Sequence, residues 1–99
     1  MNKNGIIHRF RLSITEPVEL ELTRQCQVLH VAMQQGVPHI WIARWADLHG
    51  ALVRDFHGNK RVFEIFATGA LVPNCFGHRG TIVDEQRGLV WHVFEKDFS

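Results

Sequence analysis

The sequence predicts an all-β fold, a single-domain antiparallel β-sandwich or partly open small barrel of about six to eight strands. Apolar and polar residues alternate with a period of two along much of the chain, as in strands that bury one face. Turn signals recur about every eight to twelve residues, the spacing of small sandwiches and barrels. The 99 residues suffice for one core, so residues 1–99 are expected to form one domain.

The clearest alternation begins at Phe10 and predicts two strands. Its apolar members are Phe10, Leu12, Ile14, Val18, Leu20 and Leu22. A hairpin closed through residues 15–17 would place Arg11 opposite Glu21 on one face. It would place Leu12 opposite Leu20 on the other, so both faces would be complementary.

A second hairpin is predicted over residues 27–42. Leu29, Val31 and Met33 share one face of its first strand, and Gln-Gln-Gly at 34–36 supplies the turn. Because Pro38 has no N–H to donate to a ladder, we expect it at a strand start or a sheet edge.

The segment from residue 41 to 58 fits both a strand and a helix. Its large apolar residues, spaced three or four apart like a helix stripe, are Trp41, Trp45, Leu48, Leu52 and Phe56. Gly50 and the lack of a clear cap weaken the helix, so a strand is favoured. A turn at 58–60 would then set Arg54 opposite Glu64.

The rest of the chain predicts a strand beginning near Phe63, a loop through Pro73 and a short strand at 81–83. A turn at 84–88 leads to the closing strand, Leu89 to Glu95.

His92 lies on the closing strand and shares a face with Val90 and Phe94. If that face is core, the imidazole needs a hydrogen-bond partner. We therefore interpret His92 as a structural histidine rather than a catalytic or metal-binding one.

Composition and motifs exclude several function classes. Eleven basic against ten acidic residues give a net charge of +1, so no nucleic-acid partner is expected. Cys26 and Cys75 follow no metal or redox spacing, which favours free thiols in a cytoplasm. The first residues form neither a signal-peptide core nor a membrane span, so no membrane partner is expected.

No catalytic residue, metal ligand or cofactor site is predicted. The seven histidines show none of the close pairings that zinc sites use. Phosphate loops and nucleophile motifs are missing from the sequence, and Cys75 has no base and orienting pair beside it. A non-enzymatic protein is therefore expected.

A contact surface is predicted between residues 41 and 58, because tryptophan and arginine are enriched where partners anchor. The candidate binding residues are Trp41, Arg44, Trp45, Arg54 and His57. The alternative left open is that these aromatic side chains fill the core.

Three stretches, VLHVAMQQGVPHIWI, FEIFATGALVP and HRGTIVDEQRGLVWHVFE, resemble a family of small uncharacterised proteins encoded mostly by tailed phages and prophages. The family pattern has an acidic strand like VELEL and V-Q-x-G-x-P-x-x-W, here 32–41 in looser form. It continues with T-G-x-x-[IV]-P at 68–73, G-T at 80–81 and G-L-V-W-H-V-F-E at 88–95. This chain is longer between 41 and 61, and the resemblance implies provenance but no activity.

Together these observations predict a phage-encoded accessory protein of the host cytoplasm that binds a host protein or a small host-made ligand. The alternatives are a minor structural protein of the virion and a histidine-metal hydrolase. Because exposed edge strands promote pairing between chains, self-association into a homo-oligomer is also expected.

Overall fold

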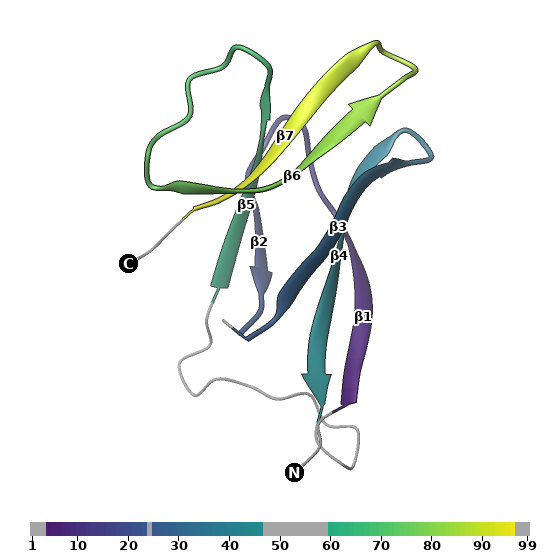
Figure 1. Cartoon of the computed structure of the whole chain (residues 1–99), viewed down its shortest axis with the longest axis vertical. Coiled ribbons are helices and arrows are strands. Elements are labelled where there is room, and N and C mark those ends of the chain that lie inside the picture. Colours follow the sequence, from purple (N-terminus) through teal and green to yellow (C-terminus); the bar gives the residue numbers. More distant parts are fainter. Residues whose placement is uncertain (1–3, 24, 47–59, 97–99) are drawn as a thin grey trace.

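A computed structural model describes residues 4–23, 25–46 and 60–96, with only the backbone of Asn4, Trp45 and Ala46 (Figure 1). Within these residues the chain forms seven strands. They are β1 (Asn4–Arg11), β2 (Val18–Glu21), β3 (Gln27–Gln34), β4 (Val37–Ala46), β5 (Lys60–Ala67), β6 (Phe76–Asp84) and β7 (Leu89–Lys96). No helix in this part of the chain is long and apolar enough to cross a membrane.

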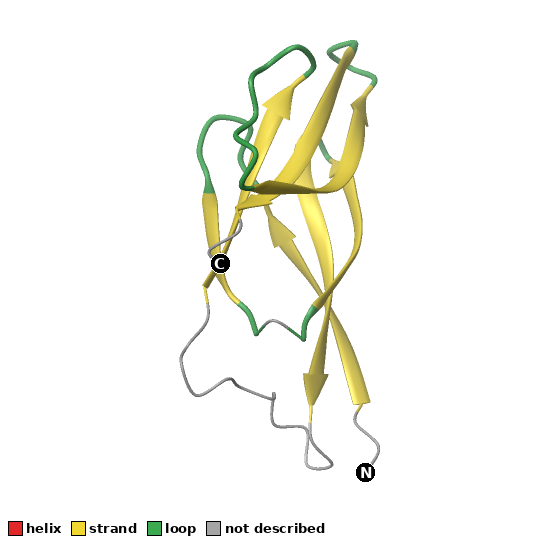
Figure 2. Ribbon diagram, turned by 60° about the vertical axis from the view of Figure 1, so that its left-hand side comes forward, coloured by secondary structure: helices red, strands yellow, loops and turns green. Residues whose placement is uncertain are grey.

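The strands form two antiparallel sheets, which confirms the all-β prediction. The three-stranded sheet has the order β1-β4-β3, and the four-stranded sheet has the order β2-β5-β7-β6. Figure 2 shows strands joined by loops throughout the described chain. The arrangement is consistent with a β-sandwich.

The core lies between the inner faces of the two sheets. Its largest fully buried side chains are Ile40 and Ile42 from β4, Phe63 from β5, Ile82 from β6 and Val93 from β7. Burying a side chain of this size contributes about 1.5–3 kcal/mol. The alternation in the sequence therefore places one apolar row of each sheet against the other.

The predicted β3–β4 hairpin is confirmed. Its two turn residues, Gln35 and Gly36, have φ of 54° and 77°. Positive φ at both positions is the type I′ geometry, whose twist matches the flanking strands. Pro38 is the second residue of β4, in agreement with the expected strand start. The predicted hairpin of the last two strands, β6 and β7, is also confirmed, although β6 begins at Phe76 and is longer than predicted.

The predicted hairpin of the first two strands is wrong. β1 pairs with β4 over eight residue pairs, from Asn4–Ala46 to Arg11–His39, whereas β2 pairs with β5 over four. The Ser13 hydroxyl accepts the N–H groups of Thr15 and Glu16, each at 3.2 Å, and turns the chain toward the other sheet. The longer ladder with β4 replaces the local one that the sequence suggested.

The two sheets approach most closely where β3 meets β6. A β-bulge between His78 and Gly80 inserts Arg79 as an extra residue in β6. A Cβ atom at Gly80 would lie 2.3 Å from Cγ2 of Val31, a buried side chain of β3. Glycine at this position therefore permits the contact between the sheets.

Gly80→Ala should destabilise the protein by about 1–3 kcal/mol, the usual cost of overpacking a core. Denaturant unfolding measures the change. In a Val31→Ala background the same substitution should cost less, because the overlapping methyl group is gone. Equal costs in the two backgrounds would contradict the assignment of the close approach to this pair.

Candidate functional site

Trp41 lies half-buried on the outer face of the three-stranded sheet, at the middle of the central strand β4. It stands opposite Arg9 of β1 and His30 of β3, so these three residues form one row across the sheet. The indole ring centroid lies 5.6 Å from that of His30 and 6.1 Å from that of His39, at interplanar angles of 44° and 48°. Two imidazoles thus flank the tryptophan on this outer face.

His39 is held in one orientation on this face. Its Nδ1 lies 2.9 Å from the carbonyl oxygen of Val37, which can only accept, so Nδ1 carries the proton. The Arg9 guanidinium donates to the side-chain oxygen of Gln34, and Arg11 stands opposite His39. These contacts fix polar groups around Trp41.

The three-stranded sheet carries only basic charge in its described strands. Arg9, Arg11 and Arg44 are its charged residues, and none of its three strands contains an aspartate or a glutamate. The strands of the other sheet contain both signs of charge, with Glu19, Glu21, Glu64, Asp84 and Glu95 beside Lys60, Arg61, Arg79 and Lys96. All carboxylates of the described strands therefore belong to the four-stranded sheet.

The structure separates the predicted binding residues. Trp41 lies on the outer face, whereas Arg44 stands opposite Ile6 and belongs to the alternate, inner face of β4. The backbone of Trp45 pairs with Gly5, and its side chain lies outside the description.

Arg54 and His57 also lie outside the described residues, as does the predicted pair between Arg54 and Glu64. On β5, Glu64 stands opposite Phe94 of β7. Of the five predicted residues, Trp41 alone is described at an outer face, and the sequence did not single out its neighbours His30, His39 and Arg9.

His92 lies half-buried on the outer face of the four-stranded sheet, not in the core as one reading of the sequence supposed. The Thr68 hydroxyl donates to the Val90 carbonyl oxygen (3.4 Å), so it accepts from Nε2 of His92 (2.9 Å). In a neutral imidazole, Nδ1 then accepts from Thr81 (3.3 Å), whose oxygen accepts from Nε2 of His78 (3.1 Å). His92 is thus hydrogen-bonded on both nitrogens.

The polar partners of this histidine chain are threonines and a histidine. Among the residues that the structure describes, no carboxylate hydrogen-bonds to either ring. A base that activates a nucleophile is usually oriented by such a third group. Among the described residues, no three histidine, cysteine, aspartate or glutamate side chains converge as metal ligands.

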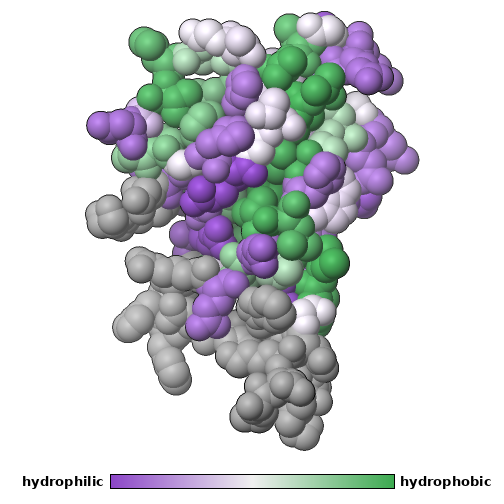
Figure 3. Space-filling view, in the orientation of Figure 1, coloured by the Kyte–Doolittle hydropathy of each residue, from purple (hydrophilic) through white to green (hydrophobic). Residues whose placement is uncertain are grey.

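A groove of about 690 Å³ opens on the same outer face. It is lined by Glu16, Pro17, Glu19, Val62, Glu64, Phe76 and Lys96. Phe66 packs edge-on against Phe76 and Phe94, with ring centroids 5.5 Å apart in both pairs, beside the groove. Hydrophobic residues also reach the surface at the upper end of Figure 3, and Leu71, in the loop after β5, is 95% exposed.

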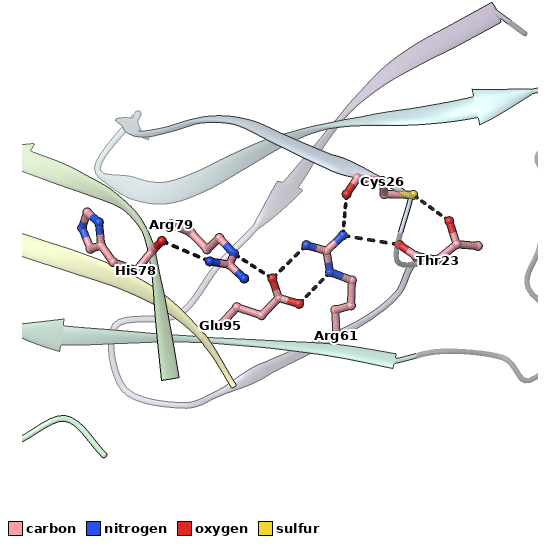
Figure 4. Close-up of polar contacts among 6 residues, drawn as sticks. All are labelled: Thr23, Cys26, Arg61, His78, Arg79 and Glu95. Atoms are coloured by element: carbon pink, nitrogen blue, oxygen red, sulfur yellow. Dashed lines mark hydrogen bonds and ion pairs between the residues drawn. The ribbon is translucent and has the colours of Figure 1, made fainter. Parts of the chain in front are cut away.

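Glu95, on the inner face of the four-stranded sheet, forms ion pairs with the buried Arg61 and the more exposed Arg79 (Figure 4). Arg61 donates from Nε and Nη2 to the two carboxylate oxygens at 2.6 and 2.8 Å, and Arg79 donates from Nε at 2.9 Å. The remaining Nη1 of Arg61 donates to the carbonyl oxygens of Thr23 and Cys26 at 3.3 and 2.6 Å. The cluster joins β5, β6 and β7 to the turn before β3.

Burial and the neighbouring arginines shift the pKa of Glu95 in opposite directions. Burial alone would raise the pKa of Glu95, but the hydrogen bonds from Arg61 and Arg79 outweigh it and lower that pKa. The hydrogen bond to Glu95 raises the pKa of Arg61. Glu95 and Arg61 therefore stay ionised as a pair, and the cluster is a structural clamp.

The sequence contains a signal for this clamp, although neither Arg61 nor Glu95 was among the predicted site residues. Arg61 has the same parity as the inward-facing Phe63 and Ile65, and Glu95 has the same parity as Val93. Charged residues in the apolar phase of two strands indicate a buried pair.

Comparison with known proteins finds one family. A family model described as a domain of unknown function, DUF7352, matches residues 3–99. No curated protein and no solved structure matches the chain. Because the match spans nearly the whole sequence, this chain belongs to the family described as domain of unknown function DUF7352.

Proposed function

We propose that this chain is a non-enzymatic binding protein, encoded by a phage or prophage, that docks a host protein in the infected cell. The outer face around Trp41 is the docking surface. The resemblance of the closing stretch GLVWHVFE to phage and prophage proteins supports the provenance.

The observation that carries the proposal is the position of Trp41. A tryptophan on the outer face of a sheet adds little to the core between the sheets, yet this one is held between two imidazoles beside an arginine. Tryptophan and arginine are the residues that most often anchor a protein partner. The described groove lies on the other sheet and not around Trp41, which favours a protein surface over a small ligand here, since small ligands favour concave sites.

The charge of this sheet indicates which kind of protein surface would fit it. The described strands of this sheet offer arginines and histidines without a carboxylate, so an acidic surface on the partner is complementary. Single-stranded nucleic acid is less well matched, because such sites present several aromatic rings for successive bases along a strongly positive groove.

Trp41→Ala should abolish capture of the host protein while changing the free energy of unfolding by about 1 kcal/mol. The measurement is affinity capture from host lysate with mass spectrometry, together with denaturant unfolding. Trp41→Phe, which keeps an aromatic ring, should retain part of the capture. The proposal fails if the wild-type protein captures nothing specific, or if Trp41→Ala captures the same protein equally well.

Trp91 provides the matched tryptophan control. It packs against the core, and its Nε1 donates to Asp84 at 3.3 Å. Trp91→Ala should therefore lose stability, by about 3–5 kcal/mol if its site behaves like other core tryptophans. Loss of capture with Trp91→Ala would reflect unfolding, whereas loss with a folded Trp41→Ala reflects contact.

A further inference from the structure

Strands β1 and β2 are edge strands of different sheets. β1 is hydrogen-bonded to β4 on one side, and β2 is hydrogen-bonded to β5 on one side. The opposite side of an edge strand presents a row of backbone N–H and C=O groups that can pair with another chain. Both strands are thus able to extend a sheet.

The exposed side chains of these strands carry opposite charges. Arg9 and Arg11 are exposed on β1, and Glu19 and Glu21 are exposed on β2. Among the described residues neither arginine is within ion-pair distance of a carboxylate.

Glu19 has one weak ion pair of its own. It lies 4.0 Å from Nζ of Lys60, and both side chains are more than half exposed. Such a pair contributes little to stability and leaves the carboxylate accessible to solvent. The arginines of β1 and the glutamates of β2 can therefore form ion pairs with each other when two copies meet.

We propose that copies of this chain associate by antiparallel pairing of β1 of one copy with β2 of another. The register sets Arg9 opposite Glu21 and Arg11 opposite Glu19. It also sets Phe10 opposite Leu20. Because directly opposed side chains point to the same face, both charged pairs lie on the outer surface and the apolar pair lies on the core side.

Charge favours this pairing over the pairing of two identical edges. Two β1 strands would bring arginines together, and two β2 strands would bring glutamates together, which is unfavourable across a ladder. Within one chain the pairing is unused, because residues 13–16 carry the backbone from one sheet to the other. A second copy supplies the complementary edge.

The pairing would join the three-stranded sheet of one copy to the four-stranded sheet of the next. Each copy has one β1 and one β2, so two copies can close reciprocally or a longer assembly can grow. This contact uses the edge of the sheet and goes beyond the proposed function, which uses Trp41 on the central strand.

Light scattering over a range of concentrations tests the proposal. The wild-type mass should rise from that of one chain, 11.4 kDa, to at least twice that value. Arg9→Glu with Arg11→Glu, and separately Glu19→Arg with Glu21→Arg, should each raise the dissociation constant by about tenfold or more. An equimolar mixture of the two double variants should associate as the wild type does, because every opposed pair is again of opposite charge.

Two controls keep this result specific. Glu85→Arg changes the charge in the β6–β7 turn, away from both edges, and should leave association unchanged. Thermal unfolding of each double variant shows whether it is folded. A wild-type protein that stays monomeric overturns the proposal, and so does a mixture of folded double variants that fails to restore association.

Discussion

Glu95→Ala should destabilise the protein by about 3–5 kcal/mol, because it leaves two arginines without their counter-ion. The side chain of Arg61 is only 13% exposed, so its charge would be left largely buried without a counter-ion. A small domain has about 5–15 kcal/mol of stability in total, so the variant should populate unfolded states at room temperature. Denaturant unfolding followed by circular dichroism measures the loss.

Arg79→Ala is the matched control for this substitution. Its side chain is 38% exposed, and its removal leaves Glu95 bound bidentately to Arg61. The expected cost is about 1 kcal/mol, the usual size of one hydrogen bond. A Glu95→Ala variant no less stable than Arg79→Ala would contradict the role of Glu95 as the centre of the clamp.

The clamp also gives stability a pH dependence with a definite sign. Because the pKa of Glu95 is lowered in the folded state, its contribution is complete above the unfolded glutamate pKa of about 4.3. The contribution is lost as the pH falls through the lower, folded-state pKa. Glu95→Gln should therefore show a shallower loss of stability in acid than the wild type.

Asp84 should preserve part of the acid sensitivity in that variant. A hydrogen bond from Arg87 lowers the pKa of Asp84; burial opposes this shift, and the hydrogen bond from Trp91 reinforces it. Its stabilising effect is likewise present above the unfolded aspartate pKa and lost as the pH falls. A wild-type protein whose stability did not change between neutral pH and about pH 3 would contradict both assignments.

Local patterns in the sequence predicted where the strands lie better than they predicted which strands pair with each other. The turn at Gln35 and Gly36 joins neighbouring strands, so local chemistry was enough to define that hairpin. The complementary alternation from Phe10 to Leu22 suggested another, but an eight-pair ladder with β4 prevailed over it. A pairing between distant segments leaves no signal in one short window of sequence.

The candidate site was predictable only in part for the same reason. Trp41 was singled out by residue type, but its neighbours Arg9 and His30 come from other strands. Net charge could not reveal that the described strands of the three-stranded sheet contain no carboxylate. Which face of the closing strand is core was also undetermined, because apolar residues occur in both phases around His92.

Phe63→Ala should cost about 3–5 kcal/mol, comparable to the loss of Glu95. Phe63 is 1% exposed, lies at the centre of the core cluster, and has the Arg61 guanidinium 5.7 Å from its ring centroid. Its removal leaves a cavity between the sheets in addition to the lost burial. Urea unfolding should show a lower midpoint with little change in slope.

Phe66 lies three residues further along the same strand. Comparing its substitution with that of Phe63 distinguishes packing in the core from packing on the outer face. Phe66 lies on the outer face, opposite His92, and packs edge-on against Phe76 and Phe94. Phe66→Ala removes aromatic contacts worth about 0.5–1.5 kcal/mol each beyond the burial of their area, but water can fill the space because the face is open. The loss should therefore be clearly smaller than for Phe63→Ala. If Phe66→Ala costs as much, the outer face of the four-stranded sheet is covered in solution, and a partner or second copy packs over the aromatic cluster.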